Sequence, residues 1–142
     1  MRRVMAEFVD PARDALAAFR ELPDDRPIMM LNLIRYRPRA VYPAAHPLIG
    51  EEISGKDAYG RYRREAAAPF ERAGGEQIWA GLPELTVIGP RDENWDLAFI
   101  ARYPTGAAFI AMLKDPDYQS AVVHRQAAVA DSRLIRCGEP GR

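Results

Sequence analysis

The longest apolar stretch of the chain runs from Pro27 to Arg35, with polar residues on both sides of it. Its positions stay apolar on both alternating faces apart from Asn32, which is typical of a strand buried on both sides. One face would carry Met29, Leu31 and Leu33, and the other Ile28, Met30, Asn32 and Ile34. Helices of a chain this short can cover one face only, so we expect a second subunit to cover the other.

A helix is predicted before this strand and an irregular segment after it. Asp10 followed by Pro11 is a typical cap and first turn, and the helix should end near Pro23. The segment 36–53 contains three prolines and Gly50. A loop this long in a compact domain is usually functional or mobile, so we interpret it as a candidate lid or dimer arm.

The second half of the chain alternates between strand and helix patterns. Ser54 and Asp57 have the spacing of a capping box before a helix whose apolar stripe ends at Gly74-Gly75. The elements expected after it are a bent strand at 76–89, a polar turn at 90–96, a strand at 97–103, a helix from 104, a helix at 116–129 capped by Asp115, and a strand at 133–137. The order, a helix and then β-α-β-β-α-β, predicts an α+β fold with a ferredoxin-like sheet.

Composition narrows the class of protein. The 142 residues suit one domain over 1–142, with a helical extension at 1–26 and a ferredoxin-like core at 27–137. The 20 basic and 20 acidic side chains cancel, which argues against a nucleic-acid binder. We expect no membrane span and no secretion signal, because no apolar run is long enough. The single cysteine, Cys137, is compatible with a cytoplasmic protein.

Several polar and aromatic residues interrupt apolar elements and are candidate ligand contacts. A buried Asn32 amide needs partners, either in the core or on a ligand in a cavity. The candidate set is Asn32, Tyr59, Tyr62, Trp79 and Arg125, with Asn32 as a hydrogen-bonding group and Arg125 as the group that recognises an anion. Aromatic residues at these spacings also suit a core or an interface, and that reading stays open.

His124 is the candidate for proton transfer, because the ordinary pKa of histidine lies near 6.5. A single helical histidine is also common as a solvated or packed side chain. His124, His46 and one cysteine are too few for a zinc site, so we expect no metal and no cofactor. A haem bound through one histidine is a weaker alternative.

Four segments together resemble the domain of unknown function 1330 family. They are Met30 to Arg35, Ala58 to Tyr62, Gly74-Gly75, and Asp115 to Arg125. The resemblance spans about residues 27–136. It implies a dimeric α+β barrel, in which two ferredoxin-like sheets pack their bare faces together, and it implies no catalytic residues. Other dimeric α+β barrels include cofactor-free monooxygenases, small-ring isomerases and haem enzymes, an analogy at the level of the fold.

Two functions from different classes are therefore weighed. The first is a cytoplasmic homodimer that binds a small, partly apolar molecule between sheet and helices, with cofactor-independent chemistry as an extension of it. The second is a non-catalytic dimerisation or interaction module, whose aromatic residues are core and interface only. A co-purifying ligand would separate them.

Overall fold

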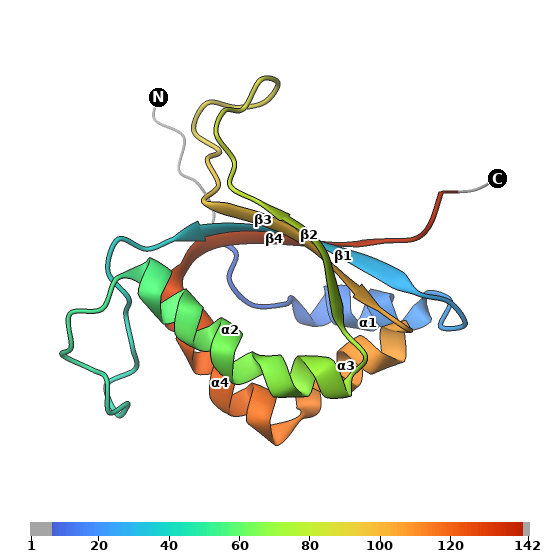
Figure 1. Cartoon of the computed structure of the whole chain (residues 1–142), viewed down its shortest axis with the longest axis horizontal. Coiled ribbons are helices and arrows are strands. Elements are labelled where there is room, and N and C mark those ends of the chain that lie inside the picture. Colours follow the sequence, from blue (N-terminus) through green and yellow to red (C-terminus); the bar gives the residue numbers. More distant parts are fainter. Residues whose placement is uncertain (1–6, 141–142) are drawn as a thin grey trace.

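The chain folds into a four-stranded sheet with helices on one of its faces (Figure 1). The computed structural model describes residues 7–140. Its elements are, in order, α1 (Arg13–Glu21), β1 (Ile28–Tyr36), α2 (Gly55–Arg72), β2 (Glu76–Gly81), β3 (Leu97–Tyr103), α3 (Gly106–Lys114), α4 (Pro116–Ala128) and β4 (Val129–Cys137). The strand order is β2-β3-β1-β4 and every neighbouring pair is antiparallel. The predicted ferredoxin-like α+β fold is confirmed.

The central position of the apolar stretch is also confirmed, because β1 lies between β3 and β4. Ile28, Met30 and Ile34 face the helices and are 1%, 3% and 0% exposed. Met29 and Leu31 point to the opposite face, as the two-residue period of a strand requires, and are only half-buried.

Side chains cap two of the helices that lie under the sheet at the predicted positions. The Ser54 hydroxyl accepts a hydrogen bond from the N–H of Asp57 at 3.0 Å at the start of α2. The Asp115 carboxylate accepts one from the N–H of Asp117 at 2.9 Å at the start of α4. Each cap satisfies a backbone donor that the first turn leaves free, so both predicted caps are confirmed. Gly74, with a φ of 77°, allows the chain to turn after α2.

The predicted cap at Asp10 is wrong. Helix α1 begins at Arg13, and Ala12 precedes it without a side-chain cap. The Asp10 carboxylate instead accepts a hydrogen bond from the side-chain N–H of Gln126 on α4, at 3.0 Å, which draws it away from its own helix. The extension expected over residues 1–26 begins outside the described residues, and the only regular element in its described part is α1.

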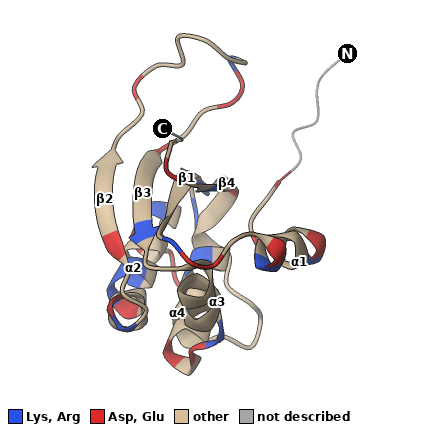
Figure 2. Cartoon of the chain, turned by 90° about the vertical axis from the view of Figure 1, so that its right-hand side faces the viewer, with Lys and Arg blue, Asp and Glu red and all other residues tan. Residues whose placement is uncertain are grey.

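The predicted strand at 76–89 is wrong beyond Gly81, where β2 ends. Residues 82–96 form an arm that projects beyond the sheet and includes residues of both charge signs (Figures 1 and 2). Pro83 removes a backbone donor at the point where pairing stops. The apolar residues of the arm remain uncovered in the single chain, and Ile88 is 95% exposed.

The long loop at 37–54 packs against α4 rather than over the middle of the sheet. The N–H of Arg37 donates to the carbonyl of Ala128 at 2.7 Å, and Tyr42 is 4% exposed. The last strand begins at Val129, four residues earlier than predicted, because Val129 already pairs with Tyr36 of β1. The junction of α4 and β4 is therefore held by the loop at Ala128 and by β1 at Val129.

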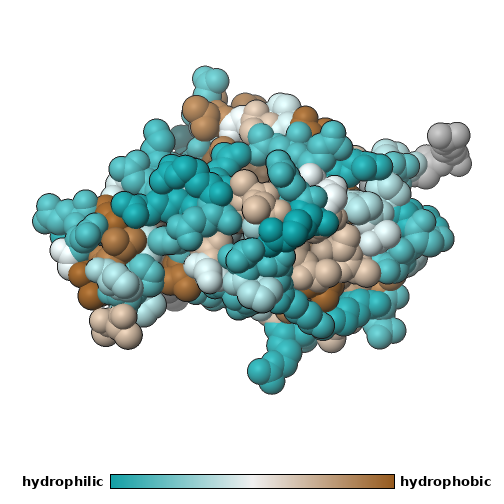
Figure 3. Space-filling view, turned by 60° about the horizontal axis from the view of Figure 1, so that its bottom comes forward, coloured by the Kyte–Doolittle hydropathy of each residue, from teal (hydrophilic) through white to brown (hydrophobic). Residues whose placement is uncertain are grey.

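The two faces of the sheet differ in what covers them. Helices α2, α3 and α4 cover one face (Figure 1), and their outer surface is largely hydrophilic (Figure 3). On the opposite face, Trp79 and Ile135 are 53% and 48% exposed. No helix within residues 7–140 is long and apolar enough to cross a membrane.

Candidate functional site

A cavity of about 360 Å³ lies between the sheet and the helices that cover it. Its walls come from β1, β3, α2, α3 and α4, with single contributions from β2, β4 and the segment before α1. Cavities of roughly 300 to 1,000 Å³ are typical of small-molecule sites. The fold therefore provides a space of the right size on the side of the sheet where the helices lie.

Apolar side chains form the larger part of the wall. Met30 and Ala101 project from paired positions of β1 and β3, and Phe109 and Met112 approach from α3. The ring of Tyr103 packs edge-on against Phe109 at 5.2 Å between ring centres. All five side chains belong to the same buried cluster, so this part of the wall is continuous with the core.

Three tyrosines from the two long helices bring hydroxyl groups to the cavity. Tyr59 and Tyr62 lie one turn apart on α2, and Tyr118 faces them from α4. The hydroxyls of Tyr62 and Tyr118 are 3.0 Å apart and form a hydrogen bond. Burial is the main cause that raises the pKa of Tyr59 and of Tyr62 above its ordinary value. Both hydroxyls therefore stay protonated at neutral pH and act as neutral hydrogen-bonding groups.

Asn32 places an amide in the same wall from the middle of β1. It pairs with Phe99 of β3 and lies on the face that the helices cover. Its side-chain N–H donates to the carbonyl of Met30 at 3.0 Å. A primary amide has two donors and an acceptor oxygen, so this bond uses only part of its capacity. The amide is fixed in place and still able to bind a ligand.

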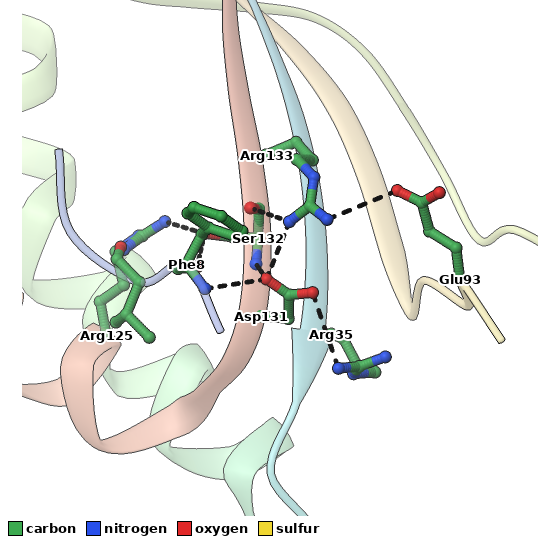
Figure 4. Close-up of polar contacts among 8 residues, drawn as sticks. Phe8, Arg35, Glu93, Arg125, Asp131, Ser132 and Arg133 are labelled. Atoms are coloured by element: carbon green, nitrogen blue, oxygen red, sulfur yellow. Dashed lines mark hydrogen bonds and ion pairs between the residues drawn. The ribbon is translucent and has the colours of Figure 1, made fainter. Parts of the chain in front are cut away.

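Arg125 lines the cavity on the side of β4. Its guanidinium donates to the backbone carbonyl of Val9 and to the Ser132 hydroxyl, the latter at 3.2 Å (Figure 4). Both partners are neutral. The charge of Arg125 also acts to lower the pKa of Tyr59 and of Tyr62, against the larger effect of burial.

The segment that holds Arg125 is the N-terminal strap, residues 8–11. The N–H of Phe8 donates to the buried carboxylate of Asp131 at 2.9 Å, and the Ser132 hydroxyl donates to the carbonyl of Phe8 at 2.7 Å (Figure 4). Pro11 contributes to the cavity wall. The strap therefore closes the cavity beside β4, which is an edge strand.

Arg63 and Gln77 line the cavity at the opposite edge of the sheet, where β2 is the outer strand. The Arg63 guanidinium donates to the side-chain oxygen of Gln77 at 2.7 Å and lies over the ring of Phe99, 5.8 Å from its centre. Arg63 is exposed, so this side of the cavity meets solvent beside a positive charge.

The structure brings together four of the residues selected from the sequence. Asn32, Tyr59, Tyr62 and Arg125 all line the cavity. Trp79 does not, because it pairs with Ile100 on the face of the sheet away from the helices. Gln77 and Trp79 would share a face in a regular strand, but the register of β2 shifts between them, so their side chains lie on opposite faces. The sequence alone did not predict this irregularity.

His124 also lies outside the cavity, on the side of α4 turned toward the long loop. Its Nδ1 is 2.7 Å from the Tyr42 hydroxyl, and its Nε2 is 2.8 Å from a carboxylate oxygen of Glu65. The ring of His46 packs edge-on against it at 5.8 Å. Burial lowers the pKa of His124, and the Glu65 carboxylate opposes that effect. The described contacts of His124 are therefore with the long loop, through Tyr42 and His46, and with Glu65 of α2.

Sequence reasoning missed Arg63, Gln77, Phe99 and Tyr118 as wall residues. A signal existed for Arg63, which lies four residues after Tyr59 and so on the same face of α2. Tyr118 lies seven residues before Arg125 and shares a face of α4 with it for the same reason. Gln77 and Phe99 required the strand register, which only the structure supplies.

A protein family and a solved structure each match most of this chain. The family model described as a domain of unknown function (DUF1330) matches residues 48–137. The crystal structure of RPA0582, a protein of unknown function from Rhodopseudomonas palustris, is 48% identical over 96% of this chain and 100% of that chain, with a TM-score of 0.87. None of the curated proteins matches the chain.

Two more distant structures share the fold only. A dabb family protein with a ferredoxin-like fold from Mesorhizobium loti is 17% identical over 82% of this chain and 99% of that chain, with a TM-score of 0.52. SnoaB, a cofactor-independent oxygenase from Streptomyces nogalater, is 15% identical over 82% of this chain and 96% of that chain, with a TM-score of 0.51.

Proposed function

The chain belongs to the DUF1330 family, and we propose that it binds a small, partly apolar organic molecule in the cavity between sheet and helices. One observation carries this proposal. Tyr62, Tyr118 and Asn32 place hydrogen-bonding groups inside a cavity whose other walls are mostly apolar. A small number of polar groups in an apolar pocket is the usual composition of a site that binds and orients an organic molecule.

The polar groups suggest how such a molecule would be held. Burial raises the pKa of Tyr62, so its hydroxyl remains protonated and can donate to or accept from a ligand oxygen without changing charge. Its hydrogen bond to the Tyr118 hydroxyl adds a second hydrogen-bonding group beside it. Asn32 adds a donor and an acceptor from the sheet. Cofactor-independent chemistry in this cavity stays a prediction, because the likeness to an oxygenase of that kind concerns the fold. The proposed site includes neither His124 nor Trp79.

The same proposal includes a homodimer. The face of the sheet away from the helices presents Trp79 and Ile135 about half exposed. Across the strands Trp79 pairs with Ile100, Ile100 with Leu31, and Leu31 with Ile135. A contiguous apolar surface of this kind is typical of a protein interface. A second copy of the chain would cover it without reaching the cavity, which lies on the opposite face.

Two alternatives, a haem-binding barrel and a purely structural module, make different predictions. A haem held by His124 would need that ring in the cavity, and both its nitrogens face other side chains. In a purely structural module the aromatic residues would serve only as core. Filling the cavity would then leave the binding of a small molecule unchanged.

A cavity-filling substitution tests the proposal. Ala66 faces the cavity from α2, whereas Ala68 lies on the same helix, is exposed and does not line the cavity. The probe is N-phenyl-1-naphthylamine, a neutral apolar dye that fluoresces when it leaves water. We expect saturable binding by the wild type and by Ala68→Trp, and at least a tenfold weaker binding by Ala66→Trp. Equal binding by both variants, with both folded by circular dichroism, would place the dye elsewhere and remove the support for a cavity site.

A further inference from the structure

The charged residues that line the cavity are all positive. Nineteen residues line the cavity, among them two arginines, Arg63 and Arg125, and no aspartate, glutamate, lysine or histidine. The other polar members carry tyrosine hydroxyls and side-chain amides. A cleft walled in this way has a positive potential, because low-dielectric walls focus the field of the charges within them.

The described contacts of Arg125 leave its charge uncompensated. Its hydrogen-bond partners are the Val9 carbonyl and the Ser132 hydroxyl, and among residues 7–140 it has no carboxylate within ion-pair distance. Half-buried arginines are usually paired with an acid, because removing a charge from water is costly. The neutral partners fix the orientation of the guanidinium, yet its remaining N–H groups stay available.

Arg63 repeats the pattern at the other edge of the sheet. It donates to the neutral oxygen of Gln77 and lies over the ring of Phe99, and it has no ion pair within the described part of the chain. Because Arg63 is exposed, solvent screens it more strongly than Arg125. The position of Arg63 therefore suits the attraction of an anion toward the cavity rather than the final binding of that anion.

From these charges we infer that the ligand of the cavity is an organic anion, an acid with a mainly apolar body. Its carboxylate or similar oxyanion would bind the guanidinium of Arg125, which can donate two parallel hydrogen bonds to such a group. Its apolar body would lie against Met30, Phe109 and Met112. This inference rests on the proposed function, since it concerns the same cavity, and it names the chemical class of the ligand.

Two dyes that differ in one group separate the inference from the proposal beneath it. N-phenyl-1-naphthylamine is neutral, and 1-anilinonaphthalene-8-sulfonate is the same ring system with a sulfonate. For Arg125→Gln we expect the anionic dye to bind roughly 10 to 100 times more weakly, the range expected for a charged hydrogen bond, and the neutral dye to change less than threefold. Arg125→Lys keeps the charge and should retain most of the binding of the anionic dye.

Arg64→Gln is the matched control, because Arg64 neighbours Arg63 on α2 and does not line the cavity. It should leave both dyes unaffected. If Arg125→Gln weakens both dyes equally or neither of them, the anion inference is wrong, whereas loss of neutral-dye binding in Ala66→Trp would still support the cavity. If Arg125→Gln does not fold, Arg63→Gln decides the question: slower association of the anionic dye alone supports the inference, and equal rates for both dyes overturn it.

Discussion

Asp131 is the residue whose loss should most damage the closed edge of the cavity. Its carboxylate is 0% exposed, and one oxygen accepts hydrogen bonds from the N–H groups of Phe8 and Ser132, both at 2.9 Å, and from Arg133 at 2.8 Å (Figure 4). The other oxygen lies 3.7 Å from the guanidinium of Arg35. The N-terminal strap and β4 therefore meet at one buried acid.

The cost of Asp131→Ala follows from the groups left behind. The N–H of Ser132 stays buried without this acceptor, at about 1 to 3 kcal/mol, and the charged bond to Arg133 adds about 1 to 2 kcal/mol after a discount for partial exposure. The N–H of Phe8 can reach water and adds little, because Phe8 is 54% exposed. We expect a loss of about 3 kcal/mol in the free energy of unfolding.

Equilibrium unfolding in urea, followed by far-ultraviolet circular dichroism at one fixed protein concentration, measures this loss. With a slope of about 2 kcal/mol per molar urea, the midpoint should fall by about 1.5 M. Asp25→Ala is the control, because Asp25 pairs with Arg26 at the exposed surface, and its midpoint should not move. If Asp131→Ala lowers the midpoint no more than Asp25→Ala, the strap is not held as described.

Three further expectations concern the loop, the helix and the sheet face. Burial lowers the pKa of His124 in the folded protein, so its contribution to stability is complete above about pH 6.5 and is lost as the pH falls through the lowered value. Thermal melts from pH 7.5 to 5 should therefore show a steeper fall in melting temperature for the wild type than for His124→Gln. Parallel curves would contradict this. Gly55→Ala should cost about 3 kcal/mol or prevent folding, because its Cβ would lie 2.0 Å from a backbone oxygen, whereas Gly60→Ala in the same helix should stabilise by about 0.5 kcal/mol; similar melting temperatures would refute the contact. Ile135→Lys should convert a dimer to a monomer in native mass spectra, and an unchanged mass would argue against this face as the interface.

The fold could be predicted well because its signals are local. The apolar stretch of β1 and the caps at Ser54 and Asp115 depend on residues close together in the sequence, and the structure confirms them. The cap at Asp10 failed because Gln126, more than a hundred residues away, competes for its carboxylate. The prediction of a strand beyond Gly81 was wrong, because an alternating apolar pattern does not show whether a partner strand is there to pair with it.

Part of the candidate site could be predicted from short stretches of sequence. Tyr59 and Tyr62 follow from the stripe on α2, and Asn32 from its position in an apolar strand. Trp79 required the register of β2, and His124 required the rotation of α4 relative to the sheet. Neither quantity is encoded in a short window of sequence, because each depends on how distant elements pack.

Adjacent methionines on opposite faces of β1 allow the central claim to be measured directly. Met30 and Met112 line the cavity, whereas Met29 points to the uncovered face of the sheet. In protein with ¹³C-labelled methionine methyl groups, we expect N-phenyl-1-naphthylamine to shift the signals of Met30 and Met112 saturably and to leave Met29 in place. A shift of Met29 without the other two would show that the dye binds the bare sheet and would contradict a ligand site between sheet and helices.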